Sequence, residues 1–254
     1  MKNIFLIKYK LRELQEKISK LGTNDEMIIE ANELAEFLVE ITKDTYNKTA
    51  ETYAGVRTYD ISETDLRAWE RLRWYISEKI NVDYSKVKFL DVGTGSGRDI
   101  KYASGLGFNI IGVDNSDTFI EILKRLEEEN RIPKGSFRKA DMRELPFEDS
   151  TFDVVRQQAA LVHLPIIEKG YMADKAIEES YRVLKENGLL YIFVKKGEGI
   201  QYIDTNEGMG GRIFQFYDEY TIKNLVERNG FKTLEIRNEK DSRNCEIILL
   251  IAQK

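Results

Sequence analysis

Three glycines, Gly93, Gly95 and Gly97, occupy alternate positions in a stretch whose pattern suits ligand binding. Glycine at every second position lets the backbone turn sharply and lets a ligand approach without meeting a Cβ atom. A short apolar run at 87–92, with the length of a buried strand, precedes the glycines, and a helical pattern at 97–105 follows them. The first turn of such a helix presents unpaired N–H groups to whatever lies on the loop. Strand, glycine loop and helix in this order predict a nucleotide-binding site.

The kind of nucleotide follows from what the loop lacks. A dinucleotide-binding loop needs a third small residue where this sequence has Arg98, and a Walker loop needs a Gly-Lys-Ser/Thr run that the stretch does not contain. We therefore expect a nucleoside cofactor without a phosphate chain. Asp91, just before the loop, would accept from an ammonium group or an ordered water, and Thr94 would contact the cofactor from within the loop.

A second acid follows the next predicted strand. Asp114 lies 21 residues after Gly93, which is the spacing at which a carboxylate reaches a ribose diol bound over the first loop. Asn115 is the next residue and is expected beside the same ligand. The alternative is that Asp114 caps the helix that begins after Ser116. A ribose-binding acid is shared by several nucleoside cofactors, so it does not distinguish among them.

The glycine loop resembles motif I of the class I S-adenosylmethionine-dependent methyltransferases. Residues 140–155 are similar to that family's pattern Asp-hydrophobic-x-x-Leu-Pro-Phe followed by Phe-Asp-hydrophobic-hydrophobic. The resemblance implies that Asp141 contacts the amino group of adenine and that Met142 lies against the ring. An acceptor for an exocyclic amine beside a polarizable thioether is a reasonable adenine site. Read without the resemblance, Asp141 could equally begin a turn.

Two tyrosines and an arginine precede the glycine loop by about 40 residues. Tyr46 and Tyr53 are seven residues apart and share a helix face, with Arg57 one turn further on. The segment resembles the family's Tyr-x-x-x-Ala-x-x-Tyr pattern. The resemblance implies a lid whose hydroxyls and guanidinium meet the carboxylate end of the cofactor, which bidentate arginine suits. The alternative is a half-exposed helix that simply packs on the core.

The strand predicted at 152–156 ends beside the cofactor loop, where open α/β sheets bind ligands. Gln157 is therefore expected to touch the methionine part of the cofactor. His163, the only histidine in the chain, falls where the family often carries a His-Leu pair that faces the substrate. It is either a base or orienting group, or a packing and hydrogen-bonding residue. The (Asp/Asn/Ser)-Pro-Pro-aromatic motif of the family's nucleic-acid enzymes is absent, which disfavours nucleic acid as a partner.

Strands and helices alternate regularly after a predicted helix that begins near Ser62 and ends near Ile80. We expect an α/β fold with a Rossmann-like, seven-stranded, mostly parallel sheet and an antiparallel last strand, preceded by an N-terminal helical cap. Residues 1–60 form the extension or lid, and residues 61–254 form the cofactor-binding domain. The expected elements are strands at 87–92, 108–113, 135–139, 152–156, 188–194, 231–238 and 245–252, and helices at 97–105, 117–129, 168–185 and 218–229.

The N-terminal helices and the segment at 196–212 complete the predicted architecture. Helical patterns at 1–21 and 27–41 form the cap; the first carries a narrow apolar seam that packs either on its own domain or in a homodimer. Residues 196–212 read as a glycine-rich loop, and loops of this length often bind ligands. Glu198, Arg212 and Phe216 are therefore expected to contact the substrate. Cys245 is expected in the core of the last strand.

Composition restricts the class of protein. The 254 residues carry a net charge of −5 with pI near 5.3, and the 39 basic residues are scattered, which disfavours nucleic acid as the main partner. One cysteine excludes a disulfide framework and a cysteine-rich zinc site, and no cluster of metal ligands is visible. The apolar run near Met1 is too short for a signal peptide, and no stretch reaches membrane-spanning length. These features predict a cytoplasmic protein.

Taken together, the sequence predicts a methyltransferase that uses S-adenosylmethionine and a small-molecule acceptor. Transfer to such an acceptor needs chiefly alignment of a nucleophile and exclusion of water. The alternatives are a methyltransferase acting on protein or RNA, a non-catalytic regulator that binds the same cofactor, and an NAD-dependent dehydrogenase. Arg98 argues against the last of these.

Overall fold

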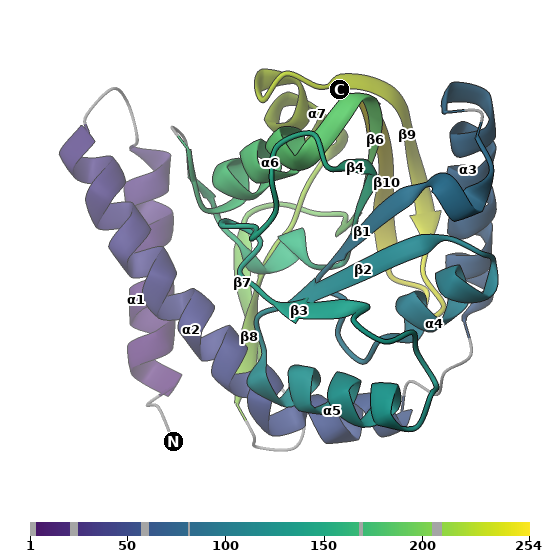
Figure 1. Ribbon diagram of the computed structural model, residues 1–254. Helices are drawn as coiled ribbons and strands as arrows, with labels where there is room; N and C mark the ends of the chain where they lie inside the picture. The colour runs from purple at the N-terminus through teal and green to yellow at the C-terminus, as the bar shows by residue number, and fades with distance from the viewer. Residues whose placement is uncertain (1–3, 21–24, 57–60, 81, 168–169, 205–209) are drawn as a thin grey trace.

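A computed structural model describes residues 4–20, 25–56, 61–80, 82–167, 170–204 and 210–254. Its centre is a seven-stranded sheet with the order β3-β2-β1-β4-β6-β10-β9 (Figure 1). β10 runs antiparallel to both of its neighbours, and the other neighbouring pairs are parallel. The predicted fold class is therefore confirmed. The strands are β1 (Lys88–Val92), β2 (Asn109–Asp114), β3 (Phe137–Lys139), β4 (Phe152–Gln158), β6 (Leu184–Lys195), β9 (Lys232–Lys240) and β10 (Glu246–Gln253).

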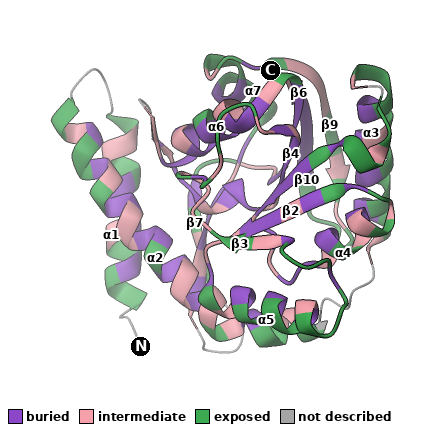
Figure 2. Ribbon diagram, viewed as in Figure 1, coloured by how far each residue is buried: buried purple, intermediate pink, exposed green. Residues whose placement is uncertain are grey.

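Helices cover both faces of the sheet, and each face has its own apolar core. Adjacent strand residues point to opposite faces, so that Phe89 joins one core and Leu90 the other. α3 (Glu63–Lys79), α4 (Arg98–Gly105) and α5 (Asp117–Glu128) pack on the first face, and α6 (Met172–Val183) and α7 (Glu219–Arg228) on the second. The inner strands β1, β4, β6 and β10 are mostly buried on both sides, as in other parallel sheets, whereas the edge strands β3 and β9 are half-buried or exposed (Figure 2).

The N-terminal cap is a helical hairpin of α1 (Ile4–Ser19) and α2 (Asp25–Val56). The prediction of a helix at 27–41 followed by a separate segment was wrong, because α2 is continuous for 32 residues. No glycine or proline interrupts it before Gly55, and the Thr45 hydroxyl donates to the carbonyl one turn earlier. The apolar seam of α1 lies against α2 within the same chain, since Ile7, Leu11 and Leu14 are buried there.

The segment expected as an irregular loop at 196–212 contains the first strand of a β-hairpin. β7 (Ile200–Asp204) pairs antiparallel with β8 (Gly211–Gln215) beside α1 and α2. β8 is buried at every residue except the half-buried Arg212, and the glycines on either side obscured the strand in the sequence. Two short elements, η1 (Tyr84–Lys86) and η2 (Leu161–His163), and the two-residue β5 (Ile166–Ile167) complete the described elements. The expectation for Cys245 was also wrong, because its thiol is exposed just before β10 begins.

No helix within the described ranges is both long enough and apolar enough to span a membrane.

Candidate active site

A cavity of about 740 Å³ opens where β1, β2 and β4 end at their carboxyl side. This volume lies in the range of small-molecule sites, and the edge of the sheet is the one where α/β folds bind ligands. α2 and β8 close it from the other side. The cavity is lined by these predicted site residues: Tyr46, Tyr53, Asp91, Gly93, Thr94, Gly95, Asp114, Asn115, Asp141, Met142 and His163.

The glycine loop has the backbone that the sequence suggested. Gly93 and Gly95 have φ of +76° and +54°, a region that L side chains rarely adopt. A Cβ on Gly93 would lie 2.4 Å from the Cβ of Ala160, so the loop can only pack against the end of β4 as glycine. A Cβ on Gly95 would meet nothing nearer than 3.9 Å, so at this position φ alone favours glycine.

Asp114 lies at the end of β2 with unused acceptor capacity. Its Oδ2 accepts from the Gly95 N–H at 2.9 Å and its Oδ1 from the Ser116 N–H at 2.9 Å. A carboxylate has about four acceptor positions, so each oxygen can still accept from a hydroxyl in the cavity. Burial raises the pKa of Asp114, although interactions with the backbone N–H groups of Ser116, Gly95 and Asn115 oppose that rise. Ser116 supplies the N-cap of α5, so the capping alternative for Asp114 is not realised.

Asp141 also lines the cavity, but its carboxylate accepts more hydrogen bonds from within the protein than expected. Its two oxygens accept from the backbone and guanidinium of Arg143 at 2.7–3.0 Å, and from the Asn115 side chain at 3.4 Å. Arg143 also pairs with Glu36 of α2 at 2.6 Å, which ties the cap to the adenine-side loop. An exocyclic amine would have to replace the long contact from Asn115. Arg143 was not predicted as a site residue, although it lies two residues from a predicted acid.

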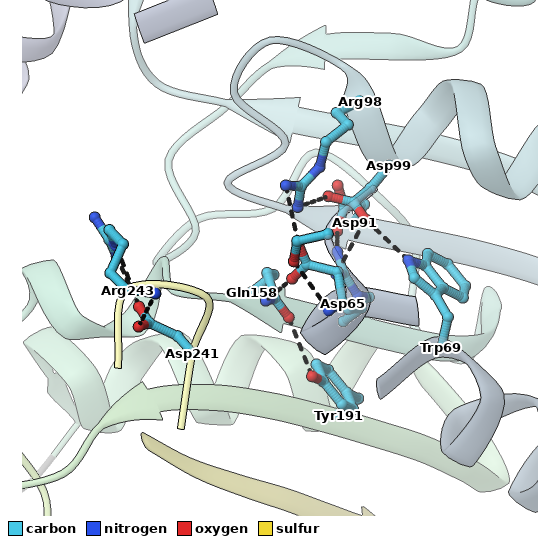
Figure 3. A network of polar contacts seen from close by, with 11 residues as sticks. Asp65, Trp69, Asp91, Arg98, Asp99, Gln158, Tyr191, Asp241 and Arg243 are labelled. Atoms are coloured by element: carbon cyan, nitrogen blue, oxygen red, sulfur yellow. Dashed lines mark hydrogen bonds and ion pairs between the residues drawn. The ribbon is translucent and has the colours of Figure 1, made fainter. Parts of the chain in front are cut away.

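Asp91 belongs to a buried network of charges rather than standing free for a ligand (Figure 3). It is 1% exposed and accepts from Arg156 Nη1 at 2.9 Å, while Arg156 Nη2 lies 3.1 Å from Asp99. Burial raises the pKa of Asp91 to about 6, although the charge of Arg156 opposes the rise. Asp91 still lines the cavity, so its expected contact with an ammonium group stays a prediction, but its first partner within the protein is Arg156.

The network continues along the cavity wall to α3. Arg98 bridges Asp65 at 2.9 Å and Asp99 at 3.1 Å, and Gln158 donates to Asp65 at 2.9 Å. Arg98 therefore has a structural role at the start of α4. It stands where a dinucleotide-binding loop has its third small residue. Asp65, Arg98, Asp99, Arg156 and Gln158 all line the cavity and were not predicted as site residues. The sequence does place these charged and polar side chains at the ends of predicted strands and helices, and this placement could have identified them.

The prediction that Gln157 touches the methionine part of the cofactor was wrong. Its side chain donates to Ser180 Oγ of α6 at 2.8 Å on the other face of the sheet, and it is fully buried. Side chains alternate along a strand, so Arg156 and Gln158 face the cavity and Gln157 cannot. Arg57 lies outside the described residues. Of the three expected substrate contacts, Arg212 lines the cavity, Glu198 is exposed, and Phe216 packs against Gly197 instead.

His163 and Tyr46 form a hydrogen-bonded pair at the cavity wall. His163 Nδ1 lies 2.8 Å from the Ile213 carbonyl, which can only accept, so Nδ1 carries the proton. Nε2 must then accept from the Tyr46 hydroxyl at 2.8 Å. Burial lowers the pKa of His163 to about 4 and raises that of Tyr46 to about 12, so both are neutral at pH 7. Because the Tyr46 proton is donated to His163, Tyr46 is not a donor to a cofactor carboxylate in this arrangement.

The fold and the site define a class: an open α/β domain that binds a nucleoside cofactor at the carboxyl edge of its sheet. Comparison with known proteins shows what this domain is similar to. Residues 90–192 match the model of a methyltransferase domain, and this stretch holds the glycine loop, Asp114 and Asp141.

Relatives and solved structures agree with this match. The sterol 24-C-methyltransferase of Candida albicans is 29% identical over 198 residues, which cover 72% of this chain and 49% of the relative. The chain thus spans about half the length of the curated relatives it matches. The Burkholderia thailandensis 1,6-didemethyltoxoflavin-N1-methyltransferase, solved with S-adenosylhomocysteine, superposes with a TM-score of 0.60 at 16% identity over 85% of this chain and 88% of that one. A Methanosarcina mazei S-adenosylmethionine-dependent methyltransferase gives 0.59 at 21% identity, with 69% and 95% covered.

Proposed function

We propose that this protein transfers the methyl group of S-adenosylmethionine to a nucleophile on a small-molecule acceptor. The observation that carries the proposal is the single cavity that runs from the ribose-binding geometry of Asp114 to the neutral pair of Tyr46 and His163. One end of it carries the carboxylate acceptors of a nucleoside site, and the whole cavity has a volume of about 740 Å³. The names of two relatives specify small organic acceptors, a sterol and 1,6-didemethyltoxoflavin.

The residues present fit the cofactor. Asp114 retains two acceptor positions for the ribose hydroxyls, and the loop at Gly93 and Gly95 lets the nucleoside approach the backbone. Met142 and the Asp141 side chain supply an apolar and a polar contact for the adenine. When bound, the cofactor would supply an electrophilic methyl carbon.

The residues of the chain itself would position the methyl acceptor, exclude water and supply a hydrogen-bond acceptor. The Tyr46 oxygen, whose own proton is donated to His163, can accept from the O–H or N–H of an acceptor and so hold the nucleophile's lone pair toward the methyl group. His163 fixes the direction of that hydroxyl. With a pKa near 4 it is a weak base, so we assign it a positioning role, which is the orienting alternative of the sequence analysis.

The test is a transfer assay with S-adenosylmethionine labelled on its methyl group. Small-metabolite, RNA and protein extracts are offered separately, with Asp114→Ala at a limiting cofactor concentration as the matched variant of weakened cofactor binding. We expect label in the small-metabolite fraction only. Label in RNA or protein would instead support those acceptors. Cofactor binding without transfer to any fraction would support a non-catalytic regulator, and binding of NAD in its place would support a dehydrogenase.

Three further predictions about the whole protein stay proposals. We propose that residues 1–60 act as an extension that covers the cofactor domain at 61–254, supported by the contacts of α2 with α5 and β8. We propose a cytoplasmic location, supported by the free, exposed thiol of the only cysteine. A homodimer through α1 would have to use its outer side, where Phe5 is 78% and Tyr9 is 63% exposed, because the inner seam packs on α2.

A further inference from the structure

The wall of the cavity beyond the cofactor loop carries three basic side chains. Its wall, which we term the acceptor chamber, comprises His163, Phe193, Lys195, Arg212, Phe214 and Arg243. These residues come from η2, the end of β6, β8 and the turn between β9 and β10. They are distant in sequence from the acids at Asp114 and Asp141 that define the adenosine end.

Lys195 and Arg212 share one aromatic ring. The Lys195 Nζ lies 4.9 Å from the centroid of Phe214, and the guanidinium carbon of Arg212 lies 5.6 Å from it. Arg212 also lies 5.0 Å from the ring centroid of Tyr46, and His163 packs 4.8 Å from Phe214. The two cations are therefore next to the pair of residues that would orient the nucleophile.

No carboxylate in the described part of the chain forms an ion pair with Lys195 or Arg212. The nearby acid, Asp241, is already bound to Arg243 at 2.9 Å. Arg212 Nε is buried and lacks a hydrogen-bond partner within the ranges the structure describes. Burial lowers the pKa of Lys195, the charges of Arg243 and Arg212 act in the same direction, and the charge of Asp241 only partly opposes them. Uncompensated cations in a partly dry site are unfavourable unless a ligand supplies negative charge.

We propose that the acceptor carries an anionic group, such as a carboxylate or a phosphate, and that Lys195 and Arg212 bind it. This inference rests on the proposed function and names the substrate class of the same site. Arginine offers a planar fork that suits such a group, and lysine adds a second point charge. Phe193 and Phe214 are each 7% exposed and would contact an apolar or aromatic body attached to that group.

The test uses the full chain saturated with S-adenosylhomocysteine. Binding of benzoate and phenyl phosphate is followed by ligand-observed NMR, with benzamide as the neutral probe of matched shape. We expect the two anions to bind at least tenfold more tightly than benzamide. Lys195→Met and Arg212→Gln should each weaken anion binding at least tenfold and leave the affinity for S-adenosylhomocysteine unchanged, which also shows that the variants fold. Lys196→Met is the control, since Lys196 does not line the cavity.

Each other outcome overturns the proposal in a different way. Equal binding of benzamide and benzoate would show that the chamber does not select charge. Loss of S-adenosylhomocysteine affinity in Lys195→Met or Arg212→Gln would mean that the cations hold the cofactor's own carboxylate, and the proposed methyltransferase function would stand. Failure of the unaltered protein to bind S-adenosylhomocysteine would remove the proposed function and this inference together.

Discussion

Replacement of Asp114 by alanine should weaken cofactor binding by between tenfold and about 100-fold. The upper figure follows from the two acceptor positions left by the hydrogen bonds from Gly95 and Ser116. If each hydrogen bond to the carboxylate contributes about 1.5 kcal/mol, two ribose hydroxyls correspond to about 3 kcal/mol and to about two powers of ten in the dissociation constant. Relaxation of the loop and entry of water would reduce the loss toward the lower figure.

The assay is isothermal titration of S-adenosylhomocysteine into the unaltered protein and the Asp114→Ala variant. Asp117→Asn is the matched control, because it removes a carboxylate three residues away that is exposed and pairs only with Lys139 among the described contacts. Circular dichroism melts separate loss of binding from loss of folding. An unchanged dissociation constant in a folded Asp114→Ala variant would refute the assignment of Asp114 to the ribose.

Three further predictions concern the buried groups around the cavity. Asp141→Ala should weaken S-adenosylhomocysteine binding less than tenfold, because Arg143 and Asn115 already occupy its acceptor positions; titration showing a larger loss than for Asp114→Ala would contradict this. Arg156→Met should lower the free energy of unfolding by about 3–5 kcal/mol in urea titrations, since it leaves Asp91 buried and unpaired, and adding Asp91→Asn should restore part of it; a change below about 1 kcal/mol would show that the ion pair is not needed. The pKa of His163 near 4, against an ordinary 6.5, means that the unfolded chain binds more protons between these values. Stability should therefore fall as pH drops from 6.5 to 4, by about 3 kcal/mol for this group, and His163→Gln should lack that part of the fall; identical pH profiles for the two proteins would count against the burial of a neutral imidazole.

The sheet could be predicted from sequence because its inner strands, such as β1, β2, β4 and β10, contain short apolar runs bounded by glycine or by polar turns. The run at 87–92 and the acid at Asp114 have the lengths and spacing that a parallel sheet with crossover helices requires. The loop conformation was equally accessible, since only glycine adopts the positive φ seen at Gly93 and Gly95 without strain.

What the sequence could not supply was the partner of each polar residue. Asp91 and Arg156 are 65 positions apart, and only the register between β1 and β4 brings them together. The error at Gln157 also came from strand register. The end of β4 was predicted to within two residues, but the sequence did not show which of its side chains face the cavity. The β7–β8 hairpin was missed because its strands are only five residues each and are flanked by glycines that suggested a loop.

The most direct test of the account is a crystal structure with S-adenosylhomocysteine bound. The account predicts that the ribose hydroxyls lie within hydrogen-bond distance of Asp114, that the adenine lies beside Met142, and that the sulfur faces the side of the cavity that holds Tyr46 and His163. A ribose bound away from Asp114, or a sulfur directed away from that pair, would contradict it.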